Sequence, residues 1–267
     1  MLIFPQLSTG ASVQYPIRRR LLQRSVRSTL DDGTIIALAD PAAAYLRWQI
    51  EFKDLSDQEV RYLKDFFNAT HGSLMPFVFL DPATNLLLWS EDYTRGSWLT
   101  TGITFDRNVT DPMGTTRAVR VRNGGSARAA ISQDTQIPGS AQVCFSAYLR
   151  ADISTTASLT RTAGSQTQSI EAPVTNIWRR FCLSGGLSGV TEPSRFAINV
   201  PAGASFELFG PQIDAQVSPS QYVVSTGSAG GIHTDARFDM KELDVIATGP
   251  NRSSCVVCIR CNLPAGE

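Results

Sequence analysis

The residues of this sequence with the most potential for chemistry are two histidines, five cysteines and a few neighbouring carboxylates. His71 and His233 lie far apart and show neither H-E-x-x-H nor H-x-H spacing. Such spacings mark histidine metal sites, and a Ser/His/Asp triad needs a histidine beside its nucleophile. The histidines therefore favour neither a metal centre nor a triad.

Glu91 and Asp92 form an adjacent pair of carboxylates. A glycosidase needs two carboxyl groups at a set separation on either side of one bond, which neighbours on a strand or turn seldom achieve. Calcium binding is less demanding and would use Glu91, Asp111 or Asp214 with backbone carbonyls, but no EF-hand spacing supports it. We predict that the protein is not an enzyme and holds no metal, with calcium as the weaker alternative.

Cys255, Cys258 and Cys261 are spaced as C-x2-C-x2-C. An iron–sulfur or zinc site needs four ligands that converge on one point, and the other two cysteines, Cys144 and Cys182, fall in a different predicted domain. On a strand, Cys258 would also face away from its two neighbours in the motif, because side chains alternate. The prediction is reduced, buried or interfacial thiols, with no cofactor.

The elements around these residues divide the chain into three regions, the first of which carries the helix signal. Residues 54–72 predict one amphipathic helix, with Ser56 and Glu59 as its capping box and Gly72 at its end. Its apolar face consists of Val60, Leu63, Phe66 and Phe67. Strands are predicted at 45–52 and 75–80, and a strand pair at 14–27 and 33–39, joined at Asp32-Gly33.

The second region, residues 85–231, is rich in Thr, Ser, Gly and Ala and has turn signals at the intervals of an antiparallel sandwich. Its predicted strands are 118–122, 143–151, 157–162, 177–184, 195–200 and 205–213. About 145 residues without a helix is the size of a jelly roll.

The third region, residues 232–267, predicts a hairpin of strands 238–247 and 255–263 around Gly249-Pro250-Asn251. A two-stranded hairpin is not stable alone, so it needs the sheet of the first region. The predicted fold class is therefore mainly β: a small β-rich domain with one α-helix, formed by 1–84 with 232–267, and an inserted β-sandwich (jelly roll) at 85–231.

The composition narrows the class of protein further. In 267 residues, Lys plus Arg and Asp plus Glu number 24 each, so no overall positive field attracts polyanions, and sequence-specific nucleic acid is not an expected partner. No apolar run reaches the roughly 18 residues of a membrane-spanning helix, and the start has no basic segment of a secretory signal. We expect folding in a cytoplasm without membrane insertion.

Two segments of the first region carry a resemblance to a known family. FPQLSTGASVQYP at 4–16 and FFNATHGSLMPFVFLDP at 66–82 resemble the distal-tail and minor tail proteins of long-tailed bacteriophages and prophages. The resemblance covers about the first 84 residues and the last 35. It implies a virion protein of the tail tip or baseplate, assembled in the host cytoplasm as a homo-oligomeric, hexameric ring. Its implied partners are the tail tube, tape-measure and baseplate hub proteins.

The middle of the chain carries a second resemblance. LLLWSEDYTRGSW at 86–98, FSAYLRA at 145–151, WRRFCLS at 178–184 and FELFGPQID at 206–214 resemble the jelly-roll carbohydrate-binding-like modules of phage tail and head proteins. This resemblance covers nearly the whole insert. It implies an outward module that binds a host-surface glycan.

The aromatic side chains of the insert are the candidates for stacking on a sugar. Trp98 follows a polar turn and Tyr148 lies on the polar face of its strand, so we predict these two as carbohydrate-binding residues with an accessible ring face. Trp89 and Trp178 lie in more apolar surroundings and are predicted to be packing residues. The alternative for Trp98 and Tyr148 is also a packing role.

A dense basic cluster lies within residues 16–27. Its members are Arg18, Arg19, Arg20, Arg24 and Arg27. The cluster could contact acidic residues of a neighbouring subunit, form a solvated strand face, or line a ring lumen that passes DNA. We predict the subunit interface, because arginine is enriched at protein interfaces.

Together these observations predict a structural virion protein that forms a ring between tail tube and baseplate hub and carries an outward jelly roll. The alternatives are an accessory protein of a carbohydrate-active enzyme, such as a glycosidase or depolymerase, and a free lectin. Both would need the sandwich but no ring.

Overall fold

The computed structural model describes residues 2–227 and 230–263, and in that part of the chain it contains fifteen strands and one α-helix. The fold is mainly β, as predicted. The chain contacts divide it into two compact units. Unit 1 is Met1–Ser8, Val13–Phe79 and His233–Glu267, and unit 2 is Thr9–Ser12 and Leu80–Ile232. No helix of the described residues is long and apolar enough to cross a membrane.

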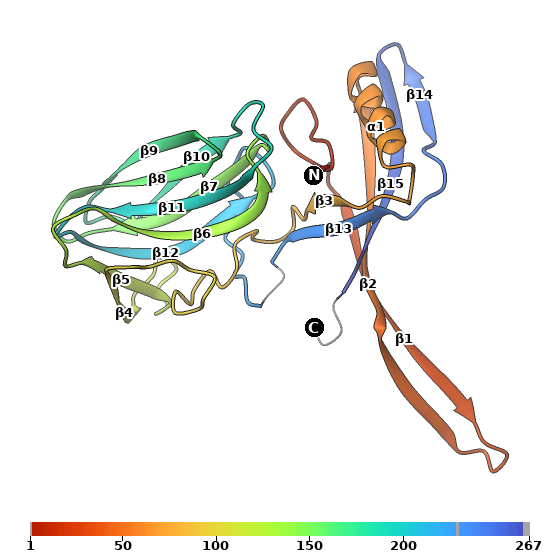
Figure 1. Ribbon diagram of the computed structural model, residues 1–267, viewed down its shortest axis with the longest axis horizontal. Helices are drawn as coiled ribbons and strands as arrows, with labels where there is room; N and C mark the ends of the chain where they lie inside the picture. The colour runs from red at the N-terminus through yellow and green to blue at the C-terminus, as the bar shows by residue number, and fades with distance from the viewer. Residues whose placement is uncertain (1, 228–229, 264–267) are drawn as a thin grey trace. The chain divides into compact units, whose positions relative to one another are not determined.

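Unit 1 is a six-stranded sheet with one helix against it (Figure 1). The strand order is β1 (Ile17–Thr29), β2 (Ile35–Leu55), β15 (Arg252–Asn262), β13 (Ile232–Phe238) and β3 (Phe77–Leu80), and β14 (Val245–Gly249) pairs with β15. The helix is α1 (Asp57–Ala69). The core between helix and sheet includes Trp48, Ile50, Phe52, Leu63, Phe77, Phe238, Val257 and Ile259.

The predicted helix and its capping box are confirmed. Ser56 is the N-cap of α1, its hydroxyl accepts from the backbone N–H of Glu59, and the Glu59 carboxylate accepts from the Ser56 backbone. Glu59 also accepts from the backbone N–H and the hydroxyl of Ser8, at 3.0 and 2.7 Å. Burial opposes the charged form of Glu59, but these hydrogen bonds outweigh it and lower its pKa to about 2.

The main difference from the prediction in unit 1 concerns β2. The two strands expected at 33–39 and 45–52 are one continuous strand of 21 residues. Its C-terminal half lies between β1 and β15, whereas its N-terminal half pairs only with β1. This free part of the β1–β2 hairpin, residues 24–40, is called the arm below. Figure 1 shows the arm projecting from the sheet of its own unit.

The C-terminal hairpin around Gly249-Pro250-Asn251 is confirmed as β14 and β15. The strand predicted at 238–247 is wrong, because β13 ends at Phe238 and β14 begins at Val245. The Asp239 N–H still donates to the carbonyl of Cys258 on β15 at 2.8 Å, and the residues from there to Val245 form a loop.

Unit 2 is a sandwich of two antiparallel sheets (Figure 1). One sheet has five strands in the order β10 (Arg179–Gly185), β7 (Val143–Arg150), β12 (Ser205–Asp214), β5 (Ala118–Asn123) and β4 (Ile103–Val109). The other has four, in the order β6 (Ala129–Pro138), β11 (Pro193–Val200), β8 (Thr155–Ala163) and β9 (Gln166–Val174). Buried side chains between the sheets include Val121, Phe145, Leu149, Leu159, Phe196, Ile198, Phe206 and Leu208.

All six strands predicted for the insert are present, and three strands were missed. The missed strands are β4, β6 and β9. All three are edge strands of their sheets, and β4 and β9 expose many of their residues, so the apolar alternation that marks a half-buried strand is weak in β4 and β9.

Candidate functional site

The outer face of the five-stranded sheet carries a set of paired polar side chains. The register places Glu207 on β12 directly between Arg120 on β5 and Arg150 on β7. Two residues further along β12, Phe209 lies opposite Tyr148 on β7, and Tyr148 lies opposite Arg180 on β10. Residues opposite one another on antiparallel strands share a face, so these side chains all point away from the core.

One end of this outer face is covered by the segment after β12. Tyr222 packs on Phe209 with ring centroids 5.0 Å apart. Gly210, at φ +58°, allows this contact, because the Tyr222 ring lies 3.0 Å from where a Cβ would be. The Gln212 amide donates to Asp214, Ser220 and the carbonyl of Gln221, which fastens the segment to the sheet.

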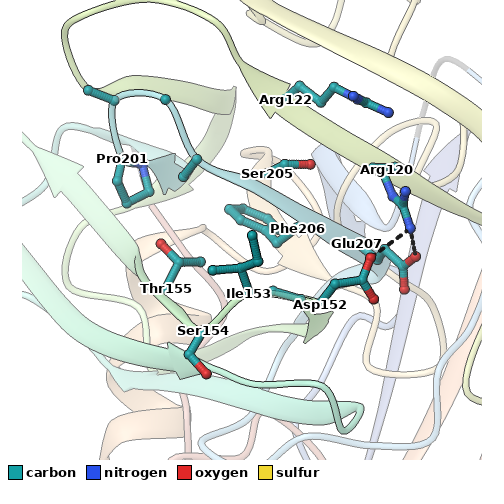
Figure 2. Close-up of a pocket in the computed structure, with 14 residues that line it drawn as sticks. Arg120, Arg122, Asp152, Ile153, Ser154, Thr155, Pro201, Ser205, Phe206 and Glu207 are labelled. Carbon is teal, nitrogen blue, oxygen red and sulfur yellow. Dashed lines mark hydrogen bonds and ion pairs between the residues drawn. The ribbon is translucent and has the colours of Figure 1, made fainter.

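The other end of the outer face is open and forms a cavity of about 370 Å³ (Figure 2). Its walls are the ends of β5 and β12, the β7–β8 loop at 151–154 and the β11–β12 loop at 201–204. Arg120 donates to Glu207 at 2.8 Å and to Asp152 at 3.2 Å, as the dashed lines in Figure 2 show. Arg122 and Ser205 line the same cavity. This volume is in the range of small-ligand pockets.

Glu207 is the buried acceptor of this network, with a side chain 5% exposed. Burial opposes its ionisation, but the hydrogen bonds from Arg150 at 2.5 Å and from Arg120 outweigh that cost. The pKa of Glu207 therefore lies below its ordinary value, and the carboxylate stays charged at neutral pH. It can accept hydrogen bonds from a ligand hydroxyl and hold both guanidinium groups in place.

The charges that line the cavity balance. Arg120 and Arg122 are matched by Asp152 and Glu207. Guanidinium groups donate and carboxylates accept in fixed directions, so the site offers both kinds of partner without a net field. Such a surface suits a neutral ligand with several hydroxyl groups better than an anion or a cation.

The predicted sugar contact at Trp98 is not supported by its position. Trp98 is only 5% exposed, its Nε1 donates to the carbonyl of Trp89 at 2.9 Å, and its ring packs on Tyr93. Tyr93 in turn stacks on Phe105. At this exposure Trp98 offers no accessible ring face for stacking, so it is a core residue.

Tyr148 lies on the outer face, as its strand position predicted, and is half-buried. Its ring contacts Phe209 at 6.0 Å, and the Arg180 guanidinium lies 5.3 Å from its centre. Trp178, predicted to be a packing residue, is also half-buried, and Arg150 lies 4.9 Å over its ring. Trp178 is therefore the aromatic residue that contacts the charged network, through Arg150.

Sequence reasoning missed the network of Arg120, Arg150, Asp152 and Glu207. A signal for part of it exists, because Arg120 and Arg122 alternate with Val119 and Val121 along β5. Alternation identifies a polar face but cannot say which strand supplies the partner carboxylate.

The carboxylates considered for catalysis or calcium are used by the fold. Glu91 accepts from Arg117 at 3.1 Å and from the Tyr222 hydroxyl at 3.0 Å. Asp92 accepts from Arg95 and Arg107, and Asp111 accepts from backbone N–H groups of its own loop. Within the described part of the chain, no group of three or more metal-type ligands is present.

The cysteine motif lies on β15 with the alternation that its spacing predicted. Cys255 and Cys261 point into the core, whereas Cys258 is half-buried on the opposite face. Burial raises the pKa of the Cys255 and Cys261 thiols to about 11, so both stay protonated and unreactive at neutral pH.

The five arginines of the basic cluster all lie on β1 and are exposed. Arg24 pairs with Asp40 on β2, with its Nε 2.9 Å from the carboxylate. The apolar side chains on the same face of the arm are exposed as well: Val26, Ile36 and Leu38 are 44 to 64% exposed. The arm therefore combines arginines with an uncovered aliphatic stripe.

A groove of about 540 Å³ lies on unit 1, on the face of the sheet away from α1. Register places Val256 opposite Glu51 and Ile246 opposite Ser254, so these side chains share that face. The loop between β13 and β14 borders it with Met240, Lys241, Glu242 and Asp244.

No protein-family model matches the chain, and no curated protein matches it. The similar solved structures include a bacteriophage CBA120 tailspike domain described as enzymatically active, at 15% identity and TM-score 0.39 over 51% of this chain. The match spans 22% of that tailspike chain.

Two further similar structures are carbohydrate-binding modules. The xylan-binding domain of Paenibacillus barcinonensis Xyn10C shows 17% identity and TM-score 0.37, with 51% of this chain and 94% of that chain covered. The module of Cellvibrio mixtus lichenase 5A, in complex with cellotriose, shows 19% identity and TM-score 0.34, covering 51% and 98%. At these values the similarities say nothing about what this chain binds.

Proposed function

We propose that the chain is a structural subunit that assembles with copies of itself through unit 1 and displays unit 2 as a glycan-binding module. The observation that carries the proposal is the arm. A two-stranded hairpin is at most marginally stable in water, and this one exposes aliphatic side chains along its length. A partner protein would cover that stripe and stabilise the arm.

The resemblance of residues 1–84 and 232–267 to phage distal-tail proteins supports the kind of assembly. It favours a homo-oligomeric, hexameric ring in the virion, between tail tube, tape-measure and baseplate hub proteins. Symmetric copies would also place many sandwiches on one particle, so that weak glycan contacts add up to useful avidity.

The assembly part is tested by measuring the mass of the purified full chain in solution over a wide concentration range. We expect an oligomer of several copies, and we expect Leu38→Asp to abolish it without lowering the melting temperature by more than a few degrees. The control is Leu74→Asp, which changes another exposed leucine of unit 1 outside the arm. A monomer at every concentration would contradict the proposal.

The glycan part rests on the open end of the outer face, where Arg120, Arg122, Asp152 and Glu207 line a cavity of about 370 Å³. A glycan array probed with the full chain should give binders that are neutral or weakly charged. Arg120→Ala should weaken binding at least tenfold, whereas Arg107→Ala, which removes an exposed arginine on β4, should not.

A free lectin and an accessory protein of a carbohydrate-active enzyme remain the alternatives. A lectin would bind the same glycans but stay monomeric. An accessory protein would release sugar from a bound polysaccharide only together with a catalytic partner. The mass measurement and a sugar-release assay separate the three.

A further inference from the structure

The arm and the groove lie at opposite ends of one sheet. Both are parts of unit 1: β2 forms the arm with its N-terminal half and borders the groove with Glu51 near its C-terminal end. Because β2 is one continuous strand held between β1 and β15, the direction of the arm is fixed by the sheet. The arm cannot turn back into the groove of its own chain.

The two surfaces match in chemistry. On the arm, Val26, Ile36 and Leu38 share one exposed face. In the groove, Ile246 and Val256 are 58 and 44% exposed, although they lie on strands of the same sheet. Each surface therefore leaves aliphatic area in water that the other could cover.

Both surfaces carry charges of both signs. The arm holds two arginines, Arg24 and Arg27, and three aspartates. The groove is lined by three acidic residues, Glu51, Glu242 and Asp244, together with Lys53 and Lys241. The aspartates of the arm, Asp31 and Asp32 at its tip among them, provide partners for those two lysines.

We propose that the arm of one copy binds in the groove of the next copy of this chain. The inference rests on the proposed assembly function and assigns the surfaces that it uses. Each copy offers one arm and one groove at opposite ends, so the contact is head to tail. A contact of this kind continues from copy to copy and closes into a ring when the rotation between copies allows it.

Two single variants of the full chain test the contact, since each changes an exposed side chain on one surface. Leu38→Asp puts a charge on the arm stripe, and Ile246→Asp puts one in the groove. Each variant alone is expected to be a monomer, because every contact would need the damaged surface. Leu74→Asp is the matched control and is expected to assemble like the unaltered chain.

The mixture of the two variants is the decisive sample. The intact arm of Ile246→Asp fits the intact groove of Leu38→Asp, and no second intact pair remains. An equimolar mixture should therefore give a dimer of one copy of each, measured by native mass spectrometry with one variant isotopically labelled.

Each other outcome overturns the inference in a distinguishable way. If Ile246→Asp alone assembles normally, the arm docks elsewhere and only the assembly function stands. If both variants are monomeric and their mixture stays so, the contact is not arm to groove. If the unaltered chain is itself a monomer at all concentrations, the inference and the proposed assembly function fall together. Circular dichroism melts check that both variants are folded.

Discussion

The two units of this chain leave different kinds of surface in contact with water. Unit 1 covers one face of its sheet with α1 and leaves aliphatic side chains exposed on the arm and in the groove. Unit 2 buries the inner faces of both sheets against each other, and its outer face pairs arginines with carboxylates. The first kind of surface is incomplete without a protein partner, whereas the second is satisfied in water and suits a polar ligand.

The largest expected effect is the independent folding of unit 2, and its failure would contradict this comparison. Residues 80–232, which contain the insert predicted at 85–231, should melt in one cooperative transition when expressed alone, because both sheets of the sandwich lie within them. Differential scanning calorimetry measures this. Loss of cooperativity would mean that the sandwich needs Thr9–Ser12, where Gly10 packs tightly against Val217, or more of unit 1.

The second largest effect concerns the core of unit 1. Phe66 on α1 packs edge-on against Phe77, with centroids 5.2 Å apart, and against Phe238 at 5.9 Å. Phe66→Ala should cost about 3 kcal/mol of unfolding free energy, at the low end for a phenylalanine because the ring is only half-buried. Denaturant titration provides the value. Tyr62→Ala on the exposed side of the same helix is the control and should cost far less, and a loss below about 1 kcal/mol for Phe66→Ala would contradict the packing.

The third prediction concerns the stability that the buried Glu207 network gives to unit 2. Glu207→Gln should destabilise unit 2 by about 2 kcal/mol, because it weakens charge-assisted hydrogen bonds from Arg120 and Arg150 to a buried acceptor. The control is Asp134→Asn, whose partner Arg195 is mostly exposed like itself and which should cost under about 1 kcal/mol. Equal losses in the two variants would remove the distinction between the buried network and an ordinary surface ion pair.

The smallest effect is a pH dependence of unit 1. The folded pKa of Glu59 is lowered from 4.5 to about 2, so its contribution is present above pH 4.5 and is lost as the pH falls toward 2. The melting temperature of unit 1 should fall over this window, and Glu59→Gln should reduce that fall while lowering stability at neutral pH. If the unaltered chain and Glu59→Gln lose the same amount of melting temperature over this pH range, other carboxylates cause the loss.

How much could be predicted from sequence differs between the two units. In unit 1, Ser56 and Glu59 are three residues apart, and a capping box depends only on that spacing, so the start of α1 was predictable. On β15 the alternation of Cys255 and Cys258 between two faces followed from strand geometry in the same way. The continuity of β2 was not predictable, because residues 40–44 between the two predicted strands carry a proline and small residues typical of a break.

The sequence alone therefore determined the relations between near neighbours: the capped helix, the alternating strands, the turn at Gly249-Pro250-Asn251 and the mainly β class. Tertiary structure decided which side chains meet. Arg120, Arg150 and Glu207 are joined only because β5, β7 and β12 pair in one register. Trp98 is buried, with its Nε1 bonded to the Trp89 carbonyl and its ring against Tyr93. Local spacing fixes the direction of a side chain relative to its own strand or helix. Burial and pairing depend on strands brought together from distant parts of the chain.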